Sequence, residues 1–177
     1  ISDSSEDGLK DLATGLNYSD KALKYLIDYF EGIEDPTIIV FFGDHMNQLG
    51  SSTEEIFEAT GYLNSDYTEL DKSYKLYKTP IVIWNNYTDI NYDMGDISSF
   101  QIMPEVMKLF NLDMPSYFNF LNEVKSNSRG FARNVVLDNN GKPSYEPDNI
   151  QSILYDKLKL IQYDHMFGKR YAEDIFK

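Results

Sequence analysis

The stretch from Pro36 to His45 reads Pro-Thr-Ile-Ile-Val-Phe-Phe-Gly-Asp-His, and it constrains the fold more than any other segment. From Thr37 to Phe42 every residue is β-branched or aromatic, a run typical of a strand buried on both faces. Ahead of it, residues 17–32 carry apolar side chains at helical spacing, and Gly32 marks a stop. A helix, a short turn and a buried strand form half of a right-handed βαβ unit, so we expect an α/β fold with a mainly parallel sheet.

Further elements follow along the chain. Thr79-Pro80 fixes the entry to a second buried strand at residues 81–84. Cap and proline signals predict helices that start near Thr53 (with Ser52 or Thr53 as the cap), Ser98, Pro115 and Asp148. The turn sequence Asn139-Asn140-Gly141 between residues 131 and 145 predicts a β-hairpin. The expected architecture is therefore a sheet with flanking helices, followed by a small C-terminal β-hairpin and a helix.

Length and composition limit the class of protein. The 177 residues fit one domain, and 42% hydrophobic with 15% aromatic residues exclude a disordered polymer. We treat residues 1–177 as one portion of a domain, in which the Ser-, Asp- and Gly-rich residues 1–16 are expected to form a flexible arm or loop. The chain starts at Ile1 rather than Met, which suggests a cut upstream.

Charge and cysteine content limit the partners. The net charge is −13, and residues 1–70 carry 15 acidic and 3 basic side chains, whereas residues 148–177 carry five of each. An acidic surface without a basic stripe repels phosphate backbones, so we expect no nucleic-acid partner. The absence of cysteine excludes disulfides and thiol chemistry but leaves the compartment open. No apolar run approaches the roughly 20 residues that span a bilayer.

Asp44 and His45 are the candidate metal ligands, because they follow the first buried strand directly. Ligands of open α/β sheets bind at the carboxyl ends of the strands. Carboxylate oxygen and imidazole nitrogen suit Zn²⁺, Mn²⁺ or a similar ion, and Gly43 allows a tight turn. The same pair also occurs as ordinary loop residues or as a helix cap. Two donors do not complete a catalytic site, and His165 on the last predicted helix is better explained by packing or exposure.

Two other motifs have simpler structural explanations. Trp84 closes the second strand, where packing at a sheet edge is a better explanation than a sugar or glycerol pocket. The residues after Asp138 do not follow the calcium-loop pattern, because Lys142 and Pro143 occupy the later ligand places.

Three strings of sequence carry a family resemblance. They are Pro36-Thr-Ile-Ile-Val-Phe-Phe-Gly-Asp-His45, Tyr77-Lys-Thr-Pro-Ile-Val-Ile-Trp-Asn-Asn-Tyr87 and Ile161-Gln-Tyr-Asp-His-Met-Phe-Gly-Lys-Arg-Tyr171. Together, in this order and at these intervals, they resemble the lipoteichoic acid synthase branch of the sulfatase family. The resemblance implies the C-terminal part of an alkaline phosphatase/sulfatase-like fold.

The same resemblance implies a function and a location. Members of this branch are metal-dependent enzymes at the outer face of Gram-positive membranes, where they move glycerol phosphate from a lipid to a cell-wall polymer. By resemblance, Asp44 and His45 bind the metal, with Mn²⁺ as the expected ion and Mg²⁺, Zn²⁺ or Ca²⁺ as alternatives. The nucleophilic threonine, the other metal ligands, the substrate-binding histidine and the transmembrane anchor are expected upstream of this chain. Residues 46–49 depart from the family pattern, so their contact with substrate is not carried over.

Several hypotheses stay open at this point. The parent is a phosphoglycerol transferase, or a sulfatase or phosphatase of the same fold, since the fold alone does not choose. Without the nucleophile, the chain by itself is a noncatalytic fragment or binding module. Its expected partners are the upstream half of the same catalytic domain and, in the parent, a glycerophospholipid or polymer. Exposed sheet surface also predicts a homodimer or an interdomain contact at the sheet edge.

Overall fold

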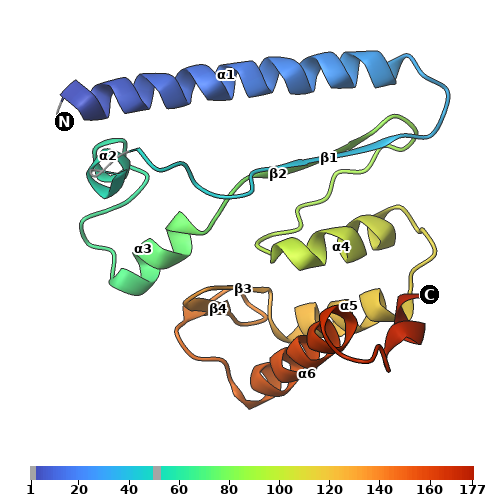
Figure 1. Ribbon diagram of the computed structural model, residues 1–177. Helices are drawn as coiled ribbons and strands as arrows, with labels where there is room; N and C mark the ends of the chain where they lie inside the picture. The colour runs from blue at the N-terminus through green and yellow to red at the C-terminus, as the bar shows by residue number, and fades with distance from the viewer. Residues whose placement is uncertain (1–2, 50–52) are drawn as a thin grey trace. The chain divides into compact units, whose positions relative to one another are not determined.

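The computed structural model describes residues 3–49 and 53–177. The chain divides into two compact units, Ile1–Tyr92 and Asp93–Lys177, and each is described by itself (Figure 1). The elements of the first unit are helices α1 (Asp3–Glu31), α2 (Thr53–Ala59) and α3 (Glu69–Leu76) and strands β1 (Ile38–Phe42) and β2 (Ile81–Asn85). The mixture of helices and strands agrees with the expected α/β composition.

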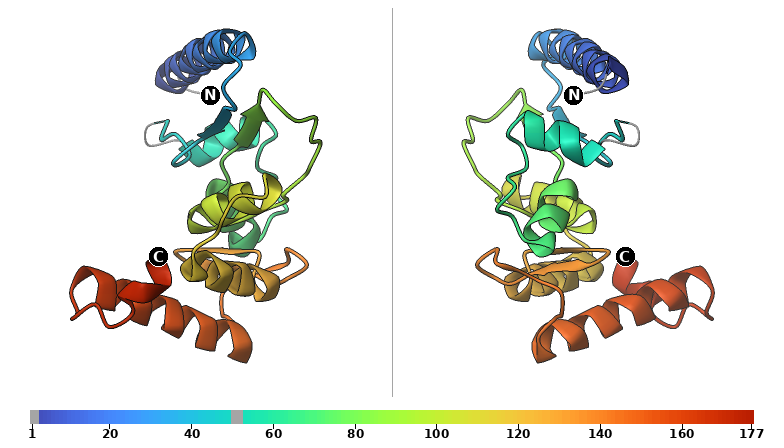
Figure 2. Two further views of the ribbon diagram at one scale, coloured as in Figure 1. Left: turned by 90° about the vertical axis from the view of Figure 1, so that its right-hand side faces the viewer. Right: turned by 90° about the vertical axis from the view of Figure 1, so that its left-hand side faces the viewer.

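Helix α1 begins much earlier than the sequence predicted. It runs unbroken from Asp3, so the expectation of an arm or loop over residues 1–16 is wrong for its described part (Figure 2). The reason lies in packing. Leu9 and Leu12 pack against a core cluster formed by Leu49, Ile56, Phe57 and Leu63. Tertiary contacts of this kind override the weak helix propensity of Ser, Asp and Gly.

The sheet of the first unit is antiparallel, which corrects the prediction of a mainly parallel sheet. β1 pairs with β2 in a register that places Ile38 opposite Asn85 and Phe42 opposite Ile81. A continuous apolar run indicates burial and β propensity, but it carries no information on strand direction. A crossover helix is required only between parallel strands. Both strands were expected to be buried, yet Phe42 is 48% exposed and Val82 is 46% exposed.

The segment between the two strands holds two short helices. α2 confirms the prediction from Thr53, with Glu54 and Glu55 in its first turn, whereas the alternative cap Ser52 lies outside the described residues. α3 was not predicted. Its signal was the pair Thr68 and Asp71, which form a capping box, and their hydrogen bond lowers the pKa of Asp71.

The second unit confirms the helices predicted from Ser98, Pro115 and Asp148. Its elements are η2 (Ser99–Gln101), α4 (Ile102–Leu109), α5 (Ser116–Asn127), β3 (Gly130–Ala132), β4 (Val135–Leu137), β5 (Pro143–Ser144), α6 (Asn149–Met166) and η3 (Glu173–Phe176). The predicted hairpin is β4–β5, and β3 adds a third antiparallel strand. In its turn the Asp138 carboxylate accepts hydrogen bonds from the backbone of Asn140 and Lys142, and Gly141 adopts a φ of 80°. Asp138 therefore has a structural role in this turn.

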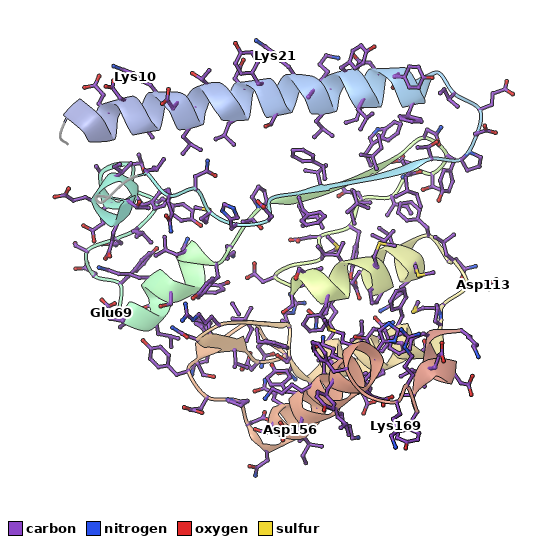
Figure 3. All side chains as sticks on the ribbon, viewed as in Figure 1. Lys10, Lys21, Glu69, Asp113, Asp156 and Lys169 are labelled. Atoms are coloured by element: carbon purple, nitrogen blue, oxygen red, sulfur yellow. The ribbon has the colours of Figure 1, made fainter. Side chains whose placement is uncertain are left out.

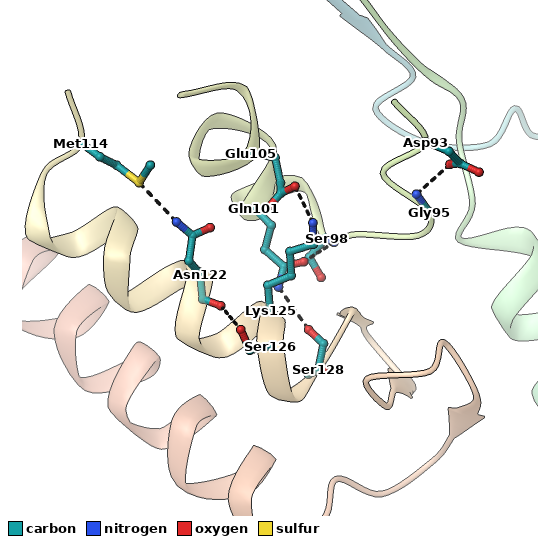
Figure 4. Close-up of polar contacts among 10 residues, drawn as sticks. All are labelled: Asp93, Gly95, Ser98, Gln101, Glu105, Met114, Asn122, Lys125, Ser126 and Ser128. Atoms are coloured by element: carbon teal, nitrogen blue, oxygen red, sulfur yellow. Dashed lines mark hydrogen bonds and ion pairs between the residues drawn. The ribbon is translucent and has the colours of Figure 1, made fainter. Parts of the chain in front are cut away.

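The core of the second unit combines apolar packing with a satisfied polar network. Val124, Val136, Leu154 and Tyr155 form its apolar cluster. The fully buried Ser128 hydroxyl contacts Tyr155, and burial raises the pKa of that phenol. Gln101 accepts from the Ser98 backbone and donates to the Ser128 carbonyl (Figure 4). Hydrogen bonds of this kind offset the cost of removing the buried polar groups from water.

Candidate metal-binding site

The turn after β1 is fixed by its neighbour, the segment that leads into β2. The Gly43 amide donates to the Pro80 carbonyl at 3.1 Å, and the Thr79 hydroxyl donates to the Gly43 carbonyl at 2.7 Å. A Cβ on Gly43 would lie 3.0 Å from the Cβ of Thr79. Gly43 has no positive φ. The structural reason that favours glycine here is therefore the close approach of Thr79, and not the backbone turn that the sequence suggested.

Asp44 and His45 come together beyond this turn, and each is oriented by the local backbone. One carboxylate oxygen of Asp44, Oδ1, accepts from the His45 amide at 2.9 Å. The other, Oδ2, lies 3.6 Å from Nε2 of His45. Nδ1 of His45 lies 3.0 Å from the Met46 carbonyl. A carbonyl only accepts, so Nδ1 carries a proton, and in the neutral form of the ring Nε2 keeps its lone pair, which lies toward Asp44.

This arrangement fits a divalent cation. Oδ2 and the neutral Nε2 are both acceptors, so they form no hydrogen bond with each other at their separation of 3.6 Å. Two donors placed roughly 2.0–2.2 Å from one ion are themselves roughly 3–3.6 Å apart at ordinary coordination angles. A backbone carbonyl on the second ring nitrogen is also the usual support of a metal-binding histidine. The residues that the sequence nominated therefore have suitable chemistry and suitable spacing.

Asp44 and His45 are exposed to solvent in this chain. The side chains of Asp44 and His45 are 84% and 76% exposed. Within residues 3–49 and 53–177, no group of three or more His, Cys, Asp or Glu side chains could hold a metal ion. A functional metal site needs at least one further donor.

A groove that was not predicted from the sequence borders the segment that follows the pair. It has a volume of about 550 Å³ and lies between α1 and residues 47–49. Its lining residues are Gly8, Asp11, Leu12, Gly15, Leu16, Ser19, Asn47, Gln48 and Leu49. Asn47 and Gln48 were set aside because they depart from the family pattern, yet both line this groove.

The sequence analysis also considered His165 and Trp84, and it favoured packing roles over functional ones for both. His165 contacts Phe176 with ring centroids 4.5 Å apart and the rings tilted by 37°, in line with a packing role. Trp84 is half-buried on β2, opposite Ile39 on β1. Among the described helices, none combines the length and apolar character needed to cross a membrane.

Comparisons with known proteins give a family match and two similar proteins. A sequence profile of the family described as Sulfatase matches residues 4–112. A protein of Rhizobium meliloti (strain 1021), named for the modification of cyclic β-1,2-glucan, is 30% identical over 171 residues. The structure of the Streptococcus pyogenes phosphoglycerol transferase GacH, solved in complex with sn-glycerol-1-phosphate, matches with a TM-score of 0.72 and 21% identity.

Both alignments cover nearly all of this chain but less than half of the similar protein. The alignment to the Rhizobium protein covers 93% of this chain but 26% of that protein. The match to GacH covers all of this chain and 40% of the GacH chain. The chain thus spans about a quarter of its curated relative, and the likeness to GacH defines the fold.

Proposed function

Because this chain belongs to the sulfatase family, we propose that it is the C-terminal part of the catalytic domain of a metal-dependent phosphoglycerol transferase. In this proposal Asp44 and His45 supply two metal ligands. The rest of the domain, upstream in the parent, supplies the other ligands and a nucleophilic threonine. The observation that carries the proposal is the orientation of Asp44 Oδ2 and His45 Nε2 toward each other directly after β1.

The chemistry assigned to these residues is limited to binding and orientation. The Met46 carbonyl keeps the proton on Nδ1 of His45, so that Nε2 stays a donor to the metal. The His45 amide holds the Asp44 carboxylate with Oδ2 turned toward the same position. A bound divalent ion, with Mn²⁺ as our expectation, would supply positive charge that stabilises the phosphoryl oxygens during transfer.

The substrate part of the proposal draws on the relatives. GacH is described as a phosphoglycerol transferase, and the Rhizobium relative is named for glucan modification. We propose a glycerophospholipid donor and a carbohydrate polymer or oligosaccharide acceptor. Such a donor requires the enzyme to work at a membrane, so we place the parent at the outer face of a bacterial cytoplasmic membrane, with its anchor outside this chain.

The test uses the complete protein that contains this chain. Asp44→Ala and His45→Ala should each reduce Mn²⁺ affinity by at least tenfold and reduce phosphoester turnover by 100-fold or more, as on loss of a catalytic metal. Calorimetric titration and release of glycerol phosphate from a lipid donor are the measurements. Asp66→Ala, at an exposed carboxylate, is the matched control and should change neither. Unchanged binding and turnover in both site variants would end the assignment.

The preferred substrate distinguishes the proposed phosphoglycerol transferase from a sulfatase or phosphatase of the same fold. If turnover of an aryl sulfate or a phosphomonoester exceeds glycerol phosphate transfer, that reaction would replace the proposed one.

We further propose that the 177-residue chain alone is noncatalytic, since it contributes two donors to the site. Hydrolysis of a phosphodiester by the purified chain, lost on chelation, would contradict this.

A further inference from the structure

The turn between β4 and β5 carries a reactive dipeptide that the proposed function does not use. Asn140 is followed by Gly141, and no other asparagine of the chain precedes a glycine. The backbone nitrogen of Gly141 can attack Cγ of the Asn140 side chain and close a succinimide ring, and the side-chain nitrogen then leaves as ammonia. Glycine favours this ring closure, because it has no Cβ to crowd the attacking nitrogen.

The turn itself requires the glycine that makes Asn140 reactive. Residues 139–141 lie outside any helix or strand, and Asn140 is exposed. Gly141 adopts a φ of 80°, a backbone conformation that other residues enter only with strain. The chain therefore keeps a reactive pair at an accessible position, because the turn depends on its second member.

The folded turn restrains the attacking nitrogen. The Gly141 amide donates to the Asp138 carbonyl at 3.0 Å, and the nitrogen attacks only after it loses this proton. Oδ1 of Asp138 accepts from the Asn140 amide and from the Lys142 amide, each at 2.8 Å. The Asp138 amide in turn donates to the Lys142 carbonyl at 3.1 Å. Asp138 thus holds the turn in the shape in which the Gly141 amide is engaged.

Modification of Asn140 would act on the same hydrogen bonds. Water opens the succinimide to aspartate or isoaspartate, so that overall a side-chain amide and a water molecule become a carboxylate and an ammonium ion. Hydrogen bonds from the amides of Lys142 and Asn140 hold the pKa of Asp138 below its usual value, so its carboxylate is ionised at neutral pH. The new negative charge would therefore lie close to an existing one and repel it.

The strands beside the turn connect it to the core of the second unit. Val136 pairs with Ser144, and Leu137 pairs with Pro143 directly after the turn. Val136 belongs to the apolar cluster of this unit. The Leu137 carbonyl accepts from the buried Ser128 hydroxyl at 2.9 Å. A turn that opens would therefore loosen a strand pair on which this core is built.

We propose that Asn140 is a site of spontaneous deamidation that Asp138 holds back in the folded chain, and that the modified residue opens the β4–β5 turn. The proposal rests on residues 128–144 and is independent of the proposed function. Its chemistry needs only water as the second reactant.

The first test compares the folded and the unfolded chain. The 177-residue chain is incubated at mildly alkaline pH with and without guanidinium chloride. Mass spectrometry and enzymatic methylation of isoaspartate then measure deamidation in the peptide that contains Asn140. The reaction should be about tenfold slower in the folded chain, because a restrained site reacts only when it opens locally. Equal rates would overturn the proposal.

The second test removes the restraint. Asp138→Ala should raise the deamidation rate of Asn140 in the folded chain about tenfold, the effect expected for the loss of a hydrogen bond to a charged group. Asp93→Ala is the matched control, since the Asp93 carboxylate accepts from the Gly95 amide at 2.8 Å in another turn of the same unit. Asp156→Ala controls for net charge, since its exposed side chain points away from the unit (Figure 3). A rate in Asp138→Ala no higher than in these two controls would overturn the proposal.

Asn127 distinguishes local release from general unfolding in Asp138→Ala. Asn127 precedes the fully buried Ser128, whose amide donates to the Val124 carbonyl at 2.8 Å, so Asn127 reacts only when the unit unfolds. A faster reaction at Asn140 with an unchanged rate at Asn127 supports the proposal. An equal rise at both asparagines would mean that Asp138 acts on stability alone, and the proposal would fail.

The third test concerns the product. Asn140→Ser removes the side-chain amide and should abolish isoaspartate in this peptide, whereas isoaspartate that persists would assign the reaction to Asn139 and overturn the proposal. Asn140→Asp imitates the added charge and should lower the denaturant midpoint relative to Asn140→Ser. Equal midpoints of these two variants would contradict the proposed opening of the turn.

Discussion

The imidazole of His45 shows how one backbone contact can decide the chemistry of a side chain. A histidine in solution exchanges its proton between two nitrogens, and each tautomer offers a different atom to a metal. Here the Met46 carbonyl holds the proton on Nδ1, while the His45 amide holds Oδ1 of Asp44. Both side chains are thus prepared by their own loop before any ion binds, which lowers the cost of assembling the site.

At the residue scale, Gly43 and Gly15 give opposite predictions for the same substitution. In Gly43→Ala the new methyl lies 3.0 Å from the Cβ of Thr79, so Thr79 or the turn that carries Asp44 has to give way. We expect unfolding free energy to fall by about 1–3 kcal/mol. We also expect weaker Mn²⁺ binding in the complete protein. Urea unfolding and metal titration are the measurements.

Gly15 is the matched control because nothing lies within 4 Å of its added Cβ, in the middle of α1. Alanine suits a helix interior better than glycine, so Gly15→Ala should raise unfolding free energy by about 0.5–1 kcal/mol. A Gly43→Ala chain as stable as the parent, with unchanged metal affinity, would show that the contact with Thr79 does not hold the turn.

The sequence nominated two residues for the candidate site, and that assignment stays a prediction, but it did not indicate the details of their geometry. Asp44 and His45 stood out because a buried strand ends just before them. The tautomer of His45, the contact between Gly43 and Thr79 and the groove beside Asn47 depend on chain segments far apart in sequence or on backbone geometry. A single sequence carries no direct signal for such contacts.

At the scale of elements, one side-chain amide connects the segment after α1 to the two-stranded sheet β1–β2. Nδ2 of Asn86 lies 2.8 Å from the Ile33 carbonyl and 3.0 Å from the Asp35 carbonyl, and Oδ1 accepts from the Thr37 amide at 2.8 Å. The end of the helix, the turn and the first strand are therefore tied to the residue that follows β2. This is a long-range connection, and no local pattern predicts it.

Asn86→Ala should therefore lower unfolding free energy by about 1–3 kcal/mol, since it leaves several backbone groups without a partner. Urea unfolding of the 177-residue chain measures the change. Asn119→Ala is the control, because Asn119 is an exposed asparagine on α5 whose loss should change stability by less than about 0.5 kcal/mol. Equal effects of the two substitutions would mean that the Asn86 amide does not join these elements.

The elements also show where sequence patterns succeed and fail. Local signals found α2, α5 and α6, because caps, prolines and apolar spacing act within a few residues. They failed for the start of α1, which depends on packing of Leu9 and Leu12, and for the direction of β2, which depends on a long connection. Strand direction is a property of the whole chain path, so an apolar run does not encode it.

At the scale of the whole molecule, the two-stranded sheet of the first unit leaves large apolar side chains exposed. Phe41, Phe42 and Val82 are 40%, 48% and 46% exposed, and adjacent strand residues such as Phe41 and Phe42 point to opposite faces. The sequence had predicted a strand covered on both sides. The match to GacH, which spans 40% of that chain, is consistent with covering elements in the remainder of the domain.

This proposal predicts that Phe42→Ala has different costs in two contexts. In the 177-residue chain the side chain is already half exposed, so the loss in unfolding free energy should stay near 1 kcal/mol. In the complete protein, where upstream elements would cover β1, the loss should reach about 3–5 kcal/mol, as for a buried phenylalanine. Denaturant unfolding of both proteins, each with and without the substitution, measures the difference. Small and equal losses in the two contexts would mean that nothing in the rest of the domain packs on β1, and the proposed shared catalytic domain would then lose its structural basis.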